Sequence, residues 1–239
     1  KLPANGAAIR SIVTSPFCDY ICKKYGVKMH ECLTGFKWIA AVEDDFEKDN
    51  SETYVYGLEE SYGYKVEKEV MDKDGVSAAA MCAEMTLYWA SKGKSILEHL
   101  DDMYKEFGFF EDRAISQNFP GSAGKEVMAG IMTKLRTEGL KSLGGKKVVC
   151  IKDIGNSVAY DPENPSAKTE IKLPKSNVLQ FVLEGGTIVS ARPSGTEPKI
   201  KFYINARTDA GAGLEKAKAE SGKVCDAITA EIKKVLENA

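Results

Sequence analysis

The stretch that decides the first half of the fold is residues 8–32, AIRSIVTSPFCDYICKKYGVKMHEC. Its first seven residues are mostly apolar and rich in β-branched side chains, which is typical of a buried strand. Ser15 and Pro16 then predict a helix start, with Ser15 as the N-cap and Pro16 at the first helical position. Gly26 predicts the end of that helix, and residues 27–32 a second strand. The stretch therefore predicts a strand–helix–strand unit of an α/β domain.

The segments that follow extend this unit. A helix into Phe46 and a strand over residues 53–58 come first, and Asp74 is then a suitable N-cap for a helix over residues 76–91. Ser95 and Glu98 have the spacing of a capping box, which predicts one more helix, ending at Gly108. We expect residues 1–115 to form an α/β domain with a mixed sheet flanked by helices.

The pattern changes in the second half. A helix is predicted over residues 124–137. A final helix is also predicted, with apolar residues on one face from Val224 to Val235. Alternating strands are predicted over residues 146–154, 178–183, 187–191 and 199–206. Glu184-Gly185-Gly186 predicts a hairpin, and residues 156–172 read as a loop. We expect residues 116–239 to form a smaller α+β domain with an antiparallel sheet and helices on one side.

Composition excludes several classes of protein. Hydrophobic residues at 43% and charged residues at 28% are the balance of a soluble globular protein, and no apolar run approaches the roughly 20 residues of a spanning helix. Lys plus Arg (33) and Asp plus Glu (35) nearly cancel, so we expect neither a nucleic acid nor a membrane as partner. Six scattered cysteines without a signal peptide predict a cytoplasmic protein.

Two features of the first half allow alternatives. Cys18, Cys22, His30 and Cys32 could suggest zinc, but Cys18 and Cys22 fall on an amphipathic helix where buried small apolar residues are expected. The chain opens at Lys1 and soon enters a strand, which reads as a piece of a longer protein; a removed tag or a trimmed tail gives the same beginning.

The segment Arg192-Pro193-Ser194-Gly195-Thr196 lies between two predicted strands and has the groups of a phosphate site. Arg192 offers a bidentate guanidinium, Ser194 and Thr196 offer hydroxyl donors, and Gly195 lets backbone amides approach a ligand. A polar turn with no ligand has the same composition, so both interpretations stay open on this segment alone.

A second polar segment follows the strand at residues 53–58. Glu59 and Ser61 could bond vicinal sugar hydroxyls, whereas Glu59 and Glu60 should point apart because neighbours on an extended chain alternate. Lys37 lies between Phe36 and Trp38 and is either a surface lysine or a positioned ligand of an anion. An acidic, solvated turn remains the alternative.

Four motifs occur in order along the chain and resemble those of the α-D-phosphohexomutase family, closest to its phosphoglucomutases and phosphomannomutases. They are Thr34-Gly35-Phe36-Lys37-Trp38, Gly57-Leu58-Glu59-Glu60-Ser61-Tyr62-Gly63, Lys73-Asp74-Gly75 and Arg192-Pro193-Ser194-Gly195-Thr196. The resemblance covers nearly the whole chain and corresponds to the third and fourth of the family's four domains.

The resemblance implies a division of roles. Thr34, Gly35, Lys37, Glu59 and Ser61 would bind the sugar, with Lys37 near the transferring phosphate. The phosphate that is not reacting would be bound by Arg192, Ser194, Gly195 and Thr196. In the family, a phosphoserine and a hexose bisphosphate intermediate interconvert hexose 1-phosphate and hexose 6-phosphate, with glucose favoured here over mannose.

The departures from the family pattern matter equally. The sequence has neither the serine-histidine-asparagine nucleophile loop nor the Asp-Gly-Asp type magnesium loop, and Asp72-Lys73-Asp74 reads as a helix-capping turn. We therefore expect a C-terminal fragment with no catalytic residue, inactive alone, whose Mg²⁺ ligands and N-terminal domains lie elsewhere in the parent. The alternatives are a stand-alone sugar-phosphate-binding module and, more weakly, an interaction domain.

Overall fold

The chain forms two units, Lys1–Phe107 and Gly108–Ala239, in a computed structural model that describes residues 1–121, 123–195 and 197–238. The sequence placed the boundary between residues 115 and 116. The units divide earlier because strand β5 (Phe109–Asn118) pairs along its length with β12 (Lys199–Thr208) and so belongs to the second sheet.

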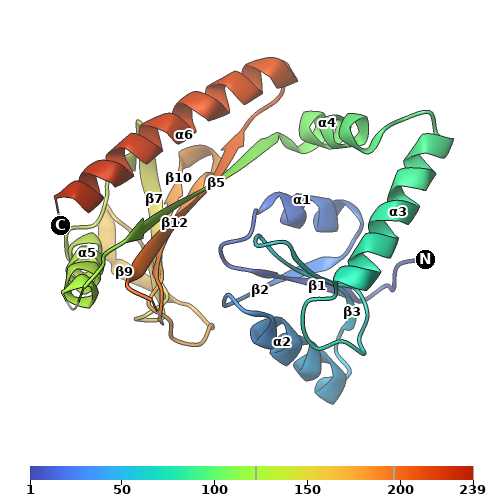
Figure 1. The fold of residues 1–239 in the computed structure, drawn as a ribbon, viewed down its shortest axis with the longest axis horizontal. Coiled ribbons are helices and arrows are strands. Elements are labelled where there is room, and N and C mark those ends of the chain that lie inside the picture. The colour runs from blue at the N-terminus through green and yellow to red at the C-terminus, as the bar shows by residue number, and fades with distance from the viewer. Residues whose placement is uncertain (122, 196, 239) are drawn as a thin grey trace. The chain divides into compact units, whose positions relative to one another are not determined.

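The first unit is a mixed sheet flanked by helices. Its strands run in the order β2-β1-β3-β4, with β1 parallel to β2 and β3, and β4 antiparallel to β3. Figure 1 shows α1 and α2 on opposite faces of this sheet, as in the predicted α/β arrangement. The elements are β1 (Gly6–Ser11), α1 (Phe17–Lys24), β2 (Lys28–Cys32), α2 (Phe36–Asp49), β3 (Thr53–Glu59), β4 (Gly63–Lys65), α3 (Gly75–Ser91) and α4 (Ile96–Phe107).

Two of the three predicted helix N-caps are confirmed. Asp74 accepts bonds from the amides of Val76 (2.9 Å) and Ser77 (3.3 Å) at the start of α3, and Ser95 and Glu98 bond reciprocally before α4. The prediction for Ser15 is wrong. Pro16 occupies the N-cap with helical angles (φ −68°), so Ser15 comes one residue too early to reach the first amides.

The second unit is an antiparallel sheet with two long helices. Its strands follow the order β5-β12-β11-β10-β7-β8-β9, and β6 pairs with β7. One core cluster holds side chains of both helices together with those of the sheet, and Figure 1 shows the two helices on the same side of it. The remaining elements are α5 (Gly124–Glu138), β6 (Ser142–Leu143), β7 (Lys146–Asp153), β8 (Val158–Asp161), β9 (Asn164–Glu170), β10 (Leu179–Leu183), the 3₁₀ turn Glu184–Gly186, β11 (Ile188–Pro193) and α6 (Leu214–Glu237).

The loop predicted over residues 156–172 is instead a hairpin. β8 and β9 pair with each other, and β8 continues the sheet from β7. β9 is exposed at every position, so its side chains carry no alternation of apolar and polar residues from which a strand could be recognised. The predicted hairpin of β10 and β11 around Glu184–Gly186 is confirmed.

Candidate functional site

The predicted sugar-binding segments lie at the carboxyl ends of the parallel strands in the first unit. β2 ends at Cys32 and leads through Thr34 and Gly35 into α2, and β3 ends at Glu59. In open α/β sheets, ligands bind outside the carboxyl ends of the strands. The topology therefore brings the two predicted segments to one edge of the sheet.

A direct hydrogen bond joins the two segments. The Glu59 carboxylate accepts from the Gly35 backbone N–H, and only 8% of Glu59 is exposed. Gly35 holds a φ of 118° just before α2, a conformation that side chains strongly disfavour. Glu59 is thus fixed against the N-terminal end of a helix, where a negative charge is stabilised.

Glu60 and Ser61 take a different direction from Glu59. The Glu60 carboxylate accepts from the hydroxyls of Ser11 and Thr14, each at 3.2 Å, and Ser61 donates to its other oxygen at 3.1 Å. The expectation that Glu59 and Glu60 point apart is confirmed. Ser61 is exposed, and its hydroxyl bonds Glu60, not Glu59.

Thr34 and Lys37 flank the Gly35 bond along the chain. Among the described atoms, Thr34 Oγ1 is buried without a hydrogen-bond partner, which is a costly arrangement for a hydroxyl. Lys37 is exposed, and its Nζ lies 5.3 Å from the centroid of the Trp38 ring. The apolar neighbour predicted from the sequence is therefore present, and the side chain remains accessible to a ligand.

Lys73 is a cation at this edge that we did not assign to the site from the sequence. Its Nζ lies 5.0 Å from the centre of the Phe36 ring and bonds Asp72 at 2.8 Å. The bond to Asp72 raises the pKa of Lys73, and Glu59 contributes in the same direction. The glycine at position 63 leaves room for both side chains, because a Cβ there would lie 2.5 Å from the Phe36 ring and 3.1 Å from Lys73.

The predicted phosphate segment lies at the end of β11 in the second unit. Arg192 is half-buried and pairs in register with Lys201 of β12. The Ser194 amide donates to the Lys199 carbonyl (2.7 Å), and its hydroxyl accepts from the Glu197 amide (3.2 Å). These bonds shape a turn in which a Cβ at Gly195 would meet open space. Thr196 lies outside the described residues.

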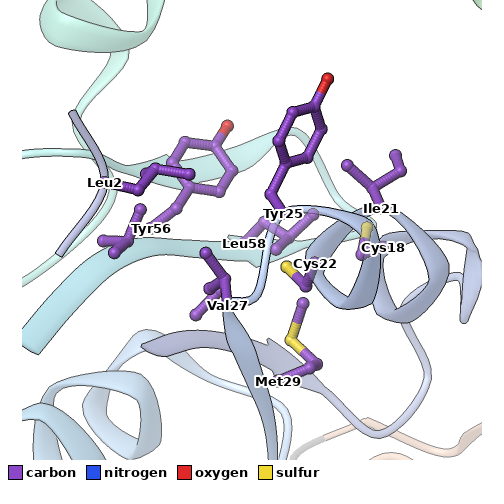
Figure 2. A pocket seen from close by; sticks show the side chains of 11 residues that line it. Leu2, Cys18, Ile21, Cys22, Tyr25, Val27, Met29, Tyr56 and Leu58 are labelled. Carbon is purple, nitrogen blue, oxygen red and sulfur yellow. The ribbon is translucent and has the colours of Figure 1, made fainter. Parts of the chain in front are cut away.

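The first unit also contains an apolar hollow of about 240 Å³, shown in Figure 2. It lies between α1 and the sheet, and Cys18, Cys22, Met29 and Tyr56 are among its lining residues. Burial raises the pKa of the Cys22 thiol. None of the predicted site residues lines it, and its apolar walls suit a sugar poorly.

Among the described residues, no group of three or more His, Cys, Asp or Glu side chains is placed to hold a metal ion. His30 contacts Glu52 and lies against Phe46, away from the hollow that Cys18 and Cys22 line. No helix within the described ranges has the length and apolar character needed to cross a membrane.

Both units match models of one protein family. The alpha/beta/alpha domain III of phosphoglucomutase/phosphomannomutase matches residues 1–107, and the C-terminal domain of the same enzymes matches residues 132–223. The two units are therefore similar to domain III and the C-terminal domain of phosphoglucomutase/phosphomannomutase. The chain belongs to the phosphoglucomutase/phosphomannomutase family.

Relatives agree with this assignment. A phosphoglucomutase of Staphylococcus epidermidis is 32% identical over 86% of the chain, and one of Staphylococcus aureus is 34% identical over 83%. The chain spans 37% and 35% of the length of these two relatives. The open form of parafusin, a phosphoglucomutase from Paramecium, shares the fold with a TM-score of 0.62 at 22% identity, over 97% of this chain and 37% of that one.

Proposed function

We propose that this chain is the sugar- and phosphate-binding part of an enzyme that interconverts hexose 1-phosphate and hexose 6-phosphate through a bisphosphorylated sugar. Glucose is the favoured hexose and mannose the next. The observation that carries the proposal is the bond between Glu59 and Gly35, because it unites two segments that the sequence assigned separately to one sugar site. Membership of the phosphoglucomutase/phosphomannomutase family supports the same reaction class.

In this proposal the residues of the chain bind and orient, and the chemistry belongs to the rest of the protein. Glu59 accepts hydrogen bonds from sugar hydroxyls, and Thr34, Gly35, Lys37 and Ser61 complete that half of the site. Arg192, Ser194, Gly195 and Thr196 hold the phosphate that is not reacting. Holding that group fixes the reacting oxygen in line, which lowers the barrier to phosphoryl transfer.

The described residues offer no ligand set for magnesium. Asp72 bonds Lys73 and Asp74 caps α3, so neither carboxylate is arranged with others around a cation. We propose that Mg²⁺ and the phosphoserine belong to N-terminal domains of the complete protein, that a hexose bisphosphate is its intermediate, and that this chain alone is inactive. Six free cysteines fit a reducing compartment, and we place the protein in the cytoplasm.

The test is a calorimetric titration of the chain with glucose 1-phosphate. Half of an active site should bind with a Kd on the order of millimolar, and Arg192→Ala should weaken binding by about 10- to 100-fold, because hydrogen bonds to charged groups contribute about 1.5–3 kcal/mol. Arg113→Ala is the matched control, since Arg113 pairs with Glu111 and Asp226 instead. Equal binding by the wild type and Arg192→Ala would refute the phosphate assignment.

A further inference from the structure

A hollow of about 240 Å³ adjoins the phosphate segment in the second unit. Ser194 and Gly195 form one wall, and two residues without an assigned role, Lys125 and Asn177, contribute to the others. Lys125 comes from the first turn of α5, and Asn177 directly precedes the buried residues that lead into β10. The hollow thus collects donors from three separate segments.

The start of α5 is held beside the phosphate segment by Phe119. The Phe119 amide donates to the Pro198 carbonyl at 2.8 Å, and Pro198 closes the turn that begins at Arg192. Gly124, the first residue of α5, lies so close to the Phe119 carbonyl that a Cβ would overlap it. Within the described part of the chain no side chain caps this helix end, and Lys125 from its first turn lines the hollow.

The orientation of Asn177 follows from its partner. Arg136 donates from its terminal nitrogen to the Asn177 side chain at 2.9 Å, and a guanidinium can only donate, so the amide oxygen must face Arg136. The Asn177 NH₂ group then remains as a donor. Asn177 lies between two hollows: the one beside Ser194 and Gly195, and a second one that Arg136 also lines. Because the amide oxygen faces Arg136, the NH₂ group points away from Arg136.

Arg136 is itself fixed by a buried carboxylate. Its Nε donates to Asp153 at 2.9 Å, and Asp153 is only 3% exposed. The negative charge at the rim of the hollow belongs to Glu197, which is paired with Lys199 at 3.0 Å. An anion in the hollow therefore meets Lys125, which has no carboxylate partner among the described residues, and an oriented amide at Asn177.

We propose that Lys125 and Asn177 bind the same phosphate group as Arg192, Ser194 and Gly195, with Arg136 as a positioning residue for Asn177. This inference rests on the proposed function and extends its phosphate site by two ligands. The ligand is a phosphate monoester, and inorganic phosphate is the simplest probe. Lys125 supplies charge, whereas Asn177 supplies hydrogen bonds.

The experiment is an NMR titration of the isotope-labelled full chain with inorganic phosphate up to about 50 mM, chosen to cover weak binding. We expect the Asn177 side-chain amide, the Lys125 backbone amide and the Gly195 backbone amide to shift with one common Kd. Movement of Gly195 without Asn177 and Lys125 would overturn the inference and leave the proposed function standing. Absence of any shift would overturn the inference together with the phosphate site.

Variants give a second measurement. Asn177→Ala should raise the phosphate Kd by about tenfold, with Asn164→Ala on exposed β9 as control. Lys125→Met should raise the Kd and flatten its dependence on salt, whereas Lys134→Met, on the same helix but outside the hollow, should not. Wild-type affinity in both Asn177→Ala and Lys125→Met would overturn the inference.

A double-mutant cycle tests the role of Arg136. Arg136→Gln should weaken phosphate binding in the wild type but add nothing in the Asn177→Ala background, a coupling that general destabilisation would not produce. Additive losses would overturn the positioning role. If phosphate binds as expected but glucose 1-phosphate binds no more tightly, the phosphate ligands stand and the sugar part of the proposed function fails.

Discussion

A buried ion pair holds the two segments of the candidate sugar site in the first unit. Lys65 is 0% exposed, and its Nζ bonds the carboxylate of Glu43, whose side chain is 2% exposed, at 2.6 Å. Glu43 lies on α2, which follows Gly35, and Lys65 ends β4, which follows the Glu59 turn. Burial raises the pKa of Glu43 even though Lys65 opposes the shift.

Replacing Lys65 by Met removes one charge of the pair and leaves the buried Glu43 carboxylate without its partner. The free energy of unfolding should fall by about 3–5 kcal/mol, since a buried charge left without its partner is heavily penalised. The double variant Lys65→Met, Glu43→Leu should recover most of that loss, because two apolar side chains of similar size need no desolvation of charge. The two substitutions should therefore be strongly non-additive.

The assay is urea unfolding followed by tryptophan fluorescence. Trp38 and Trp89, the only two tryptophans, both lie in the first unit, so the signal reports that unit. In Lys65→Met the pKa of Glu43 should be higher in the folded than in the unfolded state, so stability should fall as the pH rises through that interval. A loss below about 1 kcal/mol, or a double variant no more stable than Lys65→Met, would refute the reasoning.

Three further predictions concern the same unit. Glu59→Gln keeps the shape of the side chain but weakens its charge-assisted hydrogen bond from the Gly35 amide. Calorimetry should show that glucose 1-phosphate binds about tenfold more weakly, while Gly35 stays ordered. Gly63→Ala should lower the free energy of unfolding in urea by about 1–3 kcal/mol, since the new methyl meets the Phe36 ring; an unchanged midpoint would contradict the close approach. The bonds from Ser77 and Val76 lower the pKa of Asp74, so the stability that this cap gives α3 should be lost as the pH falls through that lowered pKa. Asp74→Ala should show less helix by circular dichroism at neutral pH, and its helix content should depend less on pH in the acid range.

The regular elements could be predicted where side-chain pattern and local chemistry agree. Asp74 and the Ser95–Glu98 capping box mark their helices within a few residues, and both are confirmed. β9 has no such pattern, because its backbone pairs with β8 while all of its side chains face solvent. The domain boundary depends on a strand whose partner, β12, lies about 90 residues later, a pairing that no local signal encodes.

The site residues divide in the same way. Glu59 and the Arg192 segment could be proposed from residue types, but the bond between Glu59 and Gly35 depends on how β3 approaches α2. Lys73 and Asn177 were missed for a related reason. Their positions follow from contacts with Phe36 and Arg136, which are distant in sequence, so their types alone do not distinguish them from surface residues.

A charge in the middle of an apolar strand is the strongest unused signal for this edge of the sheet. Arg10 lies within the first predicted strand and is 2% exposed, so its guanidinium required hydrogen-bond or charged partners. It bonds Asp19 at 2.6 Å and Glu31 at 2.9 Å, and donates to the carbonyls of Ser11 and Thr14. The hydroxyls of those two residues bond Glu60 in turn.

Arg10 thereby links the end of β1 to the turn that carries Glu59. Apolar packing of α2 stabilises the other face of the sheet, but it cannot orient a carboxylate. A network of charges with fixed partners can orient a carboxylate, but burying the charges costs desolvation energy that packing elsewhere must offset. An edge built in this way holds its polar groups in place before a ligand arrives, which is what the proposed sugar-binding role requires.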